Sequence, residues 1–232
     1  TPFIHLENRR PHGTENLYGL IHAIKNRVQI NFTYQKFWEE ELSHRHVEPY
    51  GLKEFRNRWY LVANDLKNNA IKTFGLDRMS ELEFSRQTLK TPTDFSIEEH
   101  YRYCFGIISP NSNEPEEIIL AFEPVQGKYI KTLPLHWTQD VIQDDQNALV
   151  IRLKLFVTQD LIMELLSFGK SVGVIEPDSL YNEMKSELWL AYRRKIVDNI
   201  EGKIHSGRWA EEFNVKIDNS VNPPIYTYIR KG

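Results

Sequence analysis

Hydrophobic and polar residues alternate with a period of two in the first third of the chain, a pattern typical of short β-strands. Residues 28–35 (VQINFTYQ) alternate in this way, and further runs with strand character cover residues 47–54, 58–64, 70–76 and 79–84. Five short strands within about sixty residues predict a small β-barrel. Ahead of them, apolar residues recur at helical spacing in residues 15–26 and predict a helix with Thr14 as its N-cap: Leu17, Leu20, Ile21 and Ile24.

Beyond residue 90 the order of the predicted elements carries the information. Residues 96–105 have the pattern of a short helix, and residues 109–117 (SPNSNEPEE) have the composition of a linker. The next segments predict, in order, a strand (118–124), a helix (125–133), two strands (136–143 and 148–157), a helix after Thr158 (159–168), a strand (172–177) and a final helix (178–197). This βαββαβ order is that of a ferredoxin-like domain.

The chain is therefore predicted to be an α+β protein of two modules. We expect a linker and helix in residues 1–27, a barrel in residues 28–108, a linker in residues 109–117 and a ferredoxin-like domain in residues 118–200. Residues 201–232 contain a Pro-Pro break and an alternating end, IYTYIR, and stay unassigned.

Composition and charge add a few limits. No run of about eighteen apolar residues is present, so no membrane span is expected. The net charge of −3 is uneven: residues 1–95 hold 14 Lys+Arg against 12 Asp+Glu, and residues 96–232 hold 15 against 20. The first part is thus the better host for an anion. The single cysteine, Cys104, cannot form an internal disulfide, which fits a reducing cytoplasm.

Signals for catalysis or metal binding are poor. The sequence has no phosphate-binding glycine loop, no dinucleotide-binding turn and no serine elbow. His44 and His46 would share one face of a strand, but two ligands do not close a metal site. We expect Cys104 to be a small buried hydrophobic residue rather than a nucleophile. We therefore expect a protein that is not an enzyme and needs neither a metal nor a cofactor.

Residues 56–65 (RNRWYLVAND) raise a different possibility. Alternation places Trp59 and Leu61 on one face of the strand, in the filling of the barrel, and Tyr60 on the other face beside Arg58. An outward aromatic ring next to a cation suits a ligand that has a flat ring and a negative charge, such as a nucleotide. Alternatively, Tyr60 packs under the neighbouring helix or the second module.

The segments VEPYGLKEFRNRWYLVAND (47–65) and IKTFGLDRMSEL (71–82) closely resemble the WYL domain of bacterial transcriptional regulators, named for the triplet at residues 59–61. The approach VQINFTYQKF and the exit DFSIEEHYRYCFGI fit the same family, and residues 114–197 resemble the extension that follows its barrel. The resemblance covers roughly residues 3–200. It implies an Sm-like (SH3-type) barrel and a ferredoxin-like extension that supports homodimerisation. Because the chain begins without Met on linker-like sequence, an N-terminal helix-turn-helix that contacts DNA is expected upstream.

The resemblance also implies a ligand-binding set. Tyr60 matches a ligand-face tyrosine and Arg78 a basic residue of the family, while Tyr34 and Lys72 match weaker preferences. The sequence departs from the family at Gly75, where a cation is common, and at Glu54, where many members have histidine. Cations on the hairpin turn either compensate for these departures or are plain solvated charge: Lys53, Arg56 and Arg58.

Two functions of different class follow. The first is the ligand-sensing and dimerising part of a cytoplasmic regulator, in which Arg78 and Lys72 engage the phosphates of a nucleotide or short single-stranded oligonucleotide. Tyr60 and Tyr34 would stack on a base. The second is a structural interaction module that contacts a partner protein or the expected DNA-binding domain and binds no small ligand. An enzyme acting on nucleic acid is a third possibility, disfavoured because no acid, base or metal set clusters.

Overall fold

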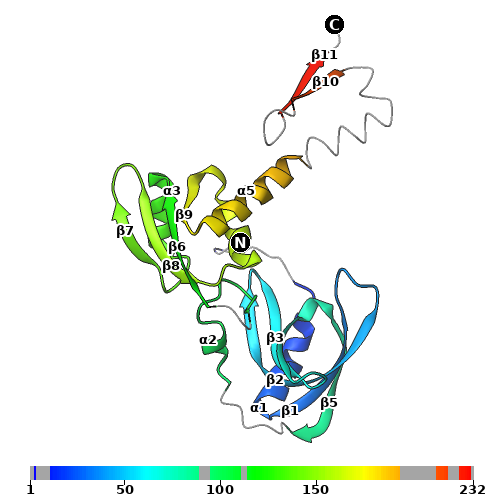
Figure 1. Cartoon of the computed structure of the whole chain (residues 1–232). Helices are drawn as coiled ribbons and strands as arrows, with labels where there is room; N and C mark the ends of the chain where they lie inside the picture. Colours follow the sequence, from blue (N-terminus) through cyan, green and yellow to red (C-terminus); the bar gives the residue numbers. More distant parts are fainter. Residues whose placement is uncertain are drawn as a thin grey trace. The chain divides into compact units, whose positions relative to one another are not determined.

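The computed structural model of the chain describes residues 3, 11–88, 95–110, 114–193, 213–218 and 225–230 (Figure 1). The chain divides into two compact units, residues 1–114 and residues 115–232. Helices and antiparallel strands occur in both units, so the prediction of a chain that mixes helices with sheets is confirmed.

The first unit is built on an antiparallel sheet of five strands in the order β4-β3-β2-β1-β5. Its strands are β1 (Val28–Gln35), β2 (Leu42–Phe55), β3 (Arg58–Asp65), β4 (Ala70–Gly75) and β5 (Met79–Thr88). Its helical elements are η1 (Thr14–Asn16), α1 (Leu17–Lys25), η2 (Leu76–Arg78) and α2 (Ile97–His100). Each of the five predicted strands is present, and β2 begins earlier than predicted.

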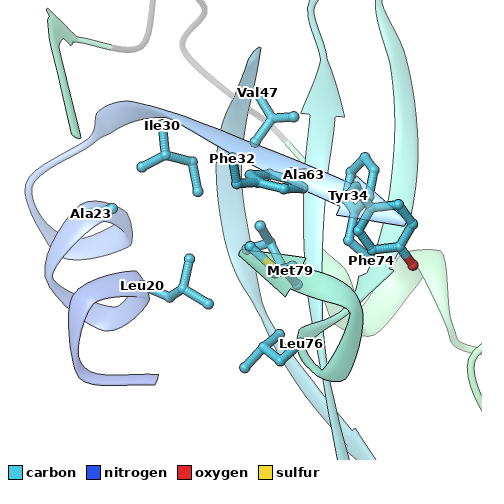
Figure 2. Packing of buried hydrophobic residues seen from close by; sticks show 11 residues of the cluster. Leu20, Ala23, Ile30, Phe32, Tyr34, Val47, Ala63, Phe74, Leu76 and Met79 are labelled. Atoms are coloured by element: carbon cyan, nitrogen blue, oxygen red, sulfur yellow. The ribbon is translucent and has the colours of Figure 1, made fainter. Parts of the chain in front are cut away.

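The core of this unit lies between α1 and the sheet. Figure 2 shows Leu20 and Ala23 of α1 at one end of the cluster, and Tyr34 beside Phe74 at the other. Leu61 is fully buried in this cluster and Trp59 packs against it, as the alternation of β3 predicts. The residues that form the cluster are Leu20, Ala23, Ile30, Phe32, Tyr34, Val47, Leu61, Ala63, Phe74, Leu76 and Met79.

The start of α1 differs from the prediction. Thr14 was expected to cap the helix, but it begins the short η1 turn, and Asn16 occupies the N-cap position without a side-chain hydrogen bond. The Thr14 hydroxyl instead donates to the carbonyl of Pro11 at 3.3 Å. Ile21, which helical spacing placed on the apolar face, is 44 % exposed, whereas Ala23, which was not in the predicted set, is fully buried.

The second unit contains the predicted order of elements. They are β6 (Glu116–Phe122), α3 (Pro124–Thr132), β7 (Asp140–Asp144), β8 (Leu149–Leu155), α4 (Gln159–Ser167), η3 (Gly169–Ser171), β9 (Val172–Glu176) and α5 (Asp178–Arg193). The four strands form an antiparallel sheet in the order β7-β8-β6-β9, and α5 packs against β9 and α4. Thr158 precedes α4 at the N-cap position, but its side chain makes no capping hydrogen bond.

The end of the chain holds two further strands where the sequence alone gave no assignment. β10 (Phe213–Asp218) and β11 (Ile225–Arg230) pair antiparallel in a sheet of their own. Residues 111–113 of the predicted linker and residues 194–197 of the predicted last helix lie outside the described residues.

Candidate functional site

Arg78, at the end of η2, lies between two aromatic rings at one end of the sheet. Its guanidinium carbon is 5.5 Å from the ring centre of Tyr34 and 5.2 Å from that of Phe37. Its Nε donates to Oδ1 of Asp77 at 3.2 Å, and the side chain is 17 % exposed. A guanidinium held in this way is pre-ordered and still reached by solvent, as an anion contact requires.

Tyr34 positions this arginine from inside the core. Its hydroxyl accepts a hydrogen bond from the backbone N–H of Gly75 at 3.2 Å, and its ring stands edge-on to those of Phe32 and Phe74. Burial raises the pKa of Tyr34, and the nearby charge of Arg78 offsets this only in part. Tyr34 is 5 % exposed, so the expectation that it stacks on a base is wrong. It supports Arg78 instead.

Tyr60 is also buried, at 7 % exposure, so the expectation that its ring faces solvent is wrong. It alternates with Leu61 of the core and pairs with Lys53 of β2, so it does face away from the cluster. On that outer face, however, lies Tyr101, which directly follows α2. Tyr101 shares a hydrogen bond of 2.6 Å with Thr73, and Lys53 lies 4.7 Å over the ring of Tyr101. The alternative interpretation, packing under a neighbouring helix, fits these contacts.

Of the predicted cations on the hairpin, Arg58 joins the Arg78 group and Arg56 does not. Arg58 forms an ion pair with Oδ2 of Asp77, so this one carboxylate bridges two guanidinium groups. Arg58 is 56 % exposed. Arg56 lies in the tight turn with a positive φ of 50° and stacks 5.3 Å from the ring of Phe55.

Glu54 and Gly75, the two departures from the family pattern, have local roles. Glu54 accepts a hydrogen bond from the backbone N–H of Asn57 at 2.6 Å, which ties its carboxylate to the turn. Gly75 provides room for Arg78: a Cβ on Gly75 would lie 2.3 Å from Nη2 of Arg78 and 2.6 Å from Oδ1 of Asp77. The guanidinium therefore occupies the space that a side chain at position 75 would fill.

Lys72 belongs to a different ionic group, so the structure does not place it with Arg78. Its Nζ donates to Oδ2 of Asp65 at 2.7 Å, and Arg45 contacts the same oxygen at 3.1 Å. Burial works against ionisation of Asp65, but the hydrogen bonds from Lys72 and Lys67 and the charges of Lys72 and Arg45 outweigh it. The pKa of Asp65 is therefore lowered.

The sequence interpretation missed the two aromatic residues of the β1–β2 turn. Phe37 is 72 % exposed and Trp38 is 74 % exposed, and residues Gln35–Glu40 line a hollow of about 400 Å³. Their signal was available: two large aromatic residues stand together in a short polar turn, where neither strand alternation nor a core explains them.

The described parts of the chain contain no group of three or more His, Cys, Asp or Glu side chains placed to hold a metal ion. His44 lies 3.1 Å from the hydroxyl of Thr33, within a strand pair. Cys104 is buried, as expected, with its Sγ 3.8 Å from the carbonyl of His100. Among the helices of the described residues, none has the length and apolar character to cross a membrane.

Comparison with known proteins identifies both units. The WYL domain model matches residues 15–84, and the WCX domain model matches residues 114–189. Protein PafB of Mycobacterium leprae is 38 % identical over 68 residues, which are 29 % of this chain and 20 % of that protein. The HTH-type transcriptional regulator YobV of Bacillus subtilis is 29 % identical over 174 residues, 72 % of this chain and 51 % of that protein. The chain thus spans about half, or less, of the length of these curated relatives.

Two solved structures are similar at lower identity. One is the proteasome accessory factor B/C (PafBC) of Arthrobacter aurescens, with 18 % identity and a TM-score of 0.36, covering 79 % of this chain and 27 % of that one. The other is a CRISPR Cas-related protein, with 15 % identity and a TM-score of 0.46, covering 79 % of this chain and 54 % of that one. The matches of the two family models show that the chain contains a WYL domain followed by a WCX domain.

Proposed function

We propose that this chain is the ligand-sensing and dimerising part of a cytoplasmic transcriptional regulator and has no catalytic activity. Its WYL domain, an Sm-like barrel, binds a nucleotide-like anion or a short single strand of nucleic acid, and its WCX domain has a ferredoxin-like fold. The full protein forms a homodimer and contacts DNA through a helix-turn-helix outside this chain. The description of YobV as an HTH-type regulator and the strand orders of both units support this proposal.

The Arg58–Asp77–Arg78 group is the observation that carries the ligand proposal. Two guanidinium groups share one carboxylate, so the group has a formal net charge of +1. A phosphate that accepts hydrogen bonds from both arginines would take over the role of Asp77, and a guanidinium offers a fork of donors for this purpose. Ligand binding would then shift the balance between two arrangements of the dimer, provided that the ligand has a different affinity for each.

The test is the binding of labelled single-stranded oligonucleotides of mixed sequence, followed by fluorescence anisotropy at several salt concentrations. We expect log K to fall linearly with log salt, with a slope of about −0.7 for each phosphate contact. Arg78→Ala removes a charged hydrogen bond of about 1.5–3 kcal/mol, so affinity falls tenfold or more, and Arg78→Lys recovers part of it.

Arg152→Ala is the matched control. Arg152 is an exposed arginine of the WCX domain that pairs with Glu117, so its loss removes the same charge without touching the Arg78 group. Unchanged affinity in Arg78→Ala would remove Arg78 from the site. A nuclease assay with divalent metals tests the absence of catalysis, and cleavage by the purified protein would refute it.

The second candidate function is a structural module that contacts a partner protein and binds no small ligand. It is favoured by Asp77, which already satisfies both arginines of the group. Isothermal titration calorimetry with mixed oligonucleotides and nucleotides distinguishes the two candidates. Heat that depends on salt and disappears in Arg78→Ala supports ligand sensing, whereas no heat at any salt concentration supports the structural module.

A further inference from the structure

The β1–β2 turn presents two adjacent aromatic side chains in a fixed shape. Lys36 and Glu39 close the turn through an ion pair of 2.8 Å and a backbone hydrogen bond of 3.1 Å. Phe37 and Trp38 lie between them, each more than 70 % exposed. Large aromatic side chains are expensive to leave in water, and scattered single cases are common, but an adjacent pair beside a hollow is typical of a binding surface.

Each ring of this pair has a cation near it. Arg78 lies 5.2 Å from the ring centre of Phe37, and Nζ of Lys36 lies 5.8 Å from that of Trp38. The high exposure of both rings leaves much of their surface open. Because Lys36 is paired with Glu39, the positive charge beside a flat ligand on this surface would come from Arg78, which suits a base with a neighbouring phosphate.

We propose that Phe37 and Trp38 form a base-stacking platform for single-stranded nucleic acid, next to the phosphate contact at Arg78. This inference rests on the proposed function and names the side chains that would hold the bases of its ligand. Single strands are favoured over duplexes because paired bases bury their faces in the stack, whereas the platform offers only ring faces. Three glutamates, Glu39 to Glu41, follow Trp38, and Glu39 is paired with Lys36, so the phosphates are expected on the Arg78 side of the platform.

The experiment separates stacking from charge. Two labelled oligonucleotides of equal length and charge are compared by anisotropy, one with bases and one with an abasic sugar-phosphate backbone. We expect the wild-type protein to prefer the strand with bases by at least fivefold, because stacking on one aromatic side chain contributes a factor of about 5 to 150 in affinity. Trp38→Ala removes most of this preference and leaves the abasic strand bound as before, and Trp38→Phe retains it. Phe37→Ala also lowers the preference, but it weakens binding of both strands because Phe37 contacts Arg78.

Trp137→Ala is the control, because Trp137 is a tryptophan of similar exposure, 63 %, in the WCX domain. It should leave both affinities unchanged. A base preference that survives in both Trp38→Ala and Phe37→Ala would overturn the platform while leaving the phosphate site in place. Failure of the wild-type protein to bind either strand would overturn the proposed function and the platform together. A change in oligomeric state in Trp38→Ala, with the base preference intact, would make the turn a protein interface and also overturn the platform.

Discussion

Gly75 is the residue whose replacement most directly tests how the Arg78 group is built. Its φ of −67° and ψ of 130° suit any residue, so glycine is not required there by backbone conformation. Glycine is required because of Arg78: a Cβ at position 75 would lie 2.3 Å from Nη2 and 2.8 Å from Nε of that arginine. Ordinary contact begins at 3.4 Å, so Gly75→Ala forces the guanidinium to retreat by about 1 Å or to leave the Tyr34 ring altogether.

The expected effect on stability is small because two contributions oppose each other. Gly→Ala at a compatible conformation stabilises by about 0.4–1 kcal/mol through the unfolded state. Weakening the hydrogen bond between Arg78 and Asp77 costs about 1 kcal/mol, since both side chains are partly reached by solvent. The free energy of unfolding should therefore change by less than about 1 kcal/mol, whereas oligonucleotide affinity should fall severalfold because the guanidinium is displaced.

A double-mutant cycle provides the decisive measurement, with urea unfolding of the wild-type protein, Gly75→Ala, Arg78→Ala and the double variant. Once Arg78 is gone, Asp77 loses one of its two partners and can rotate away, so Gly75→Ala becomes stabilising by about 0.4–1 kcal/mol. We expect a coupling energy of roughly 1 kcal/mol between the two positions. Effects that add within about 0.3 kcal/mol would refute the claim that the guanidinium fills the space at position 75.

Two further substitutions and one labelling experiment test other parts of the structure. Tyr60→Ala should lower the free energy of unfolding by about 3 kcal/mol or more, because the ring is buried; an unchanged urea midpoint would mean that the ring faces solvent. Asp65→Asn should destabilise the protein at pH 7. Folding lowers the pKa of Asp65, so its carboxylate stabilises the folded protein above the ordinary pKa of about 3.9. Thermal melts across pH should show the difference in stability from wild type narrowing as the pH falls through the folded-state pKa. Cys104 is buried, so its reaction with a thiol reagent should be slow in native protein and fast in urea; equal rates would place the thiol at the surface.

Most of the fold was predictable because burial on one face imposes a period on the sequence. The alternation in residues 28–35 predicted β1 with its observed bounds, since Ile30, Phe32 and Tyr34 all enter the core. The first part of β2 was not predictable in this way. Residues 42–46 (LSHRH) have no apolar alternation, and they form a strand because β1 pairs with them, Tyr34 with Ser43 and Phe32 with Arg45. Pairing with β1 therefore lengthens β2, and the hydrophobic pattern of one strand gives no information about its pairing partner.

The candidate site was less predictable because alternation assigns a face but does not reveal what covers it. Tyr60 is on the outer face, as inferred, but it is buried, and Tyr101, directly after α2, lies on that face. The contacts responsible join residues far apart in sequence, such as Thr73 with Tyr101. Arg78 and Tyr34 do lie together, and Lys72 does not join them because Asp65 holds it elsewhere. Ion pairs between residues that are distant in the sequence produce no periodic pattern from which they could be predicted.

The contacts of Arg78 also determine how a ligand at this site would act on the rest of the WYL domain. The guanidinium rests on the ring of Tyr34, and the hydroxyl of that ring accepts the N–H of Gly75, the residue whose missing side chain makes room for the guanidinium. These three groups therefore cannot move independently. Tyr34 is part of the buried cluster, next to Phe74 (Figure 2), and close-packed cores do not deform continuously. An anion that draws Arg78 outward must either leave Tyr34 in place and lose the contact between ring and cation, or move a core residue. Only in the second case would the ligand have a different affinity for two arrangements of the WYL domain, which is the condition that sensing requires.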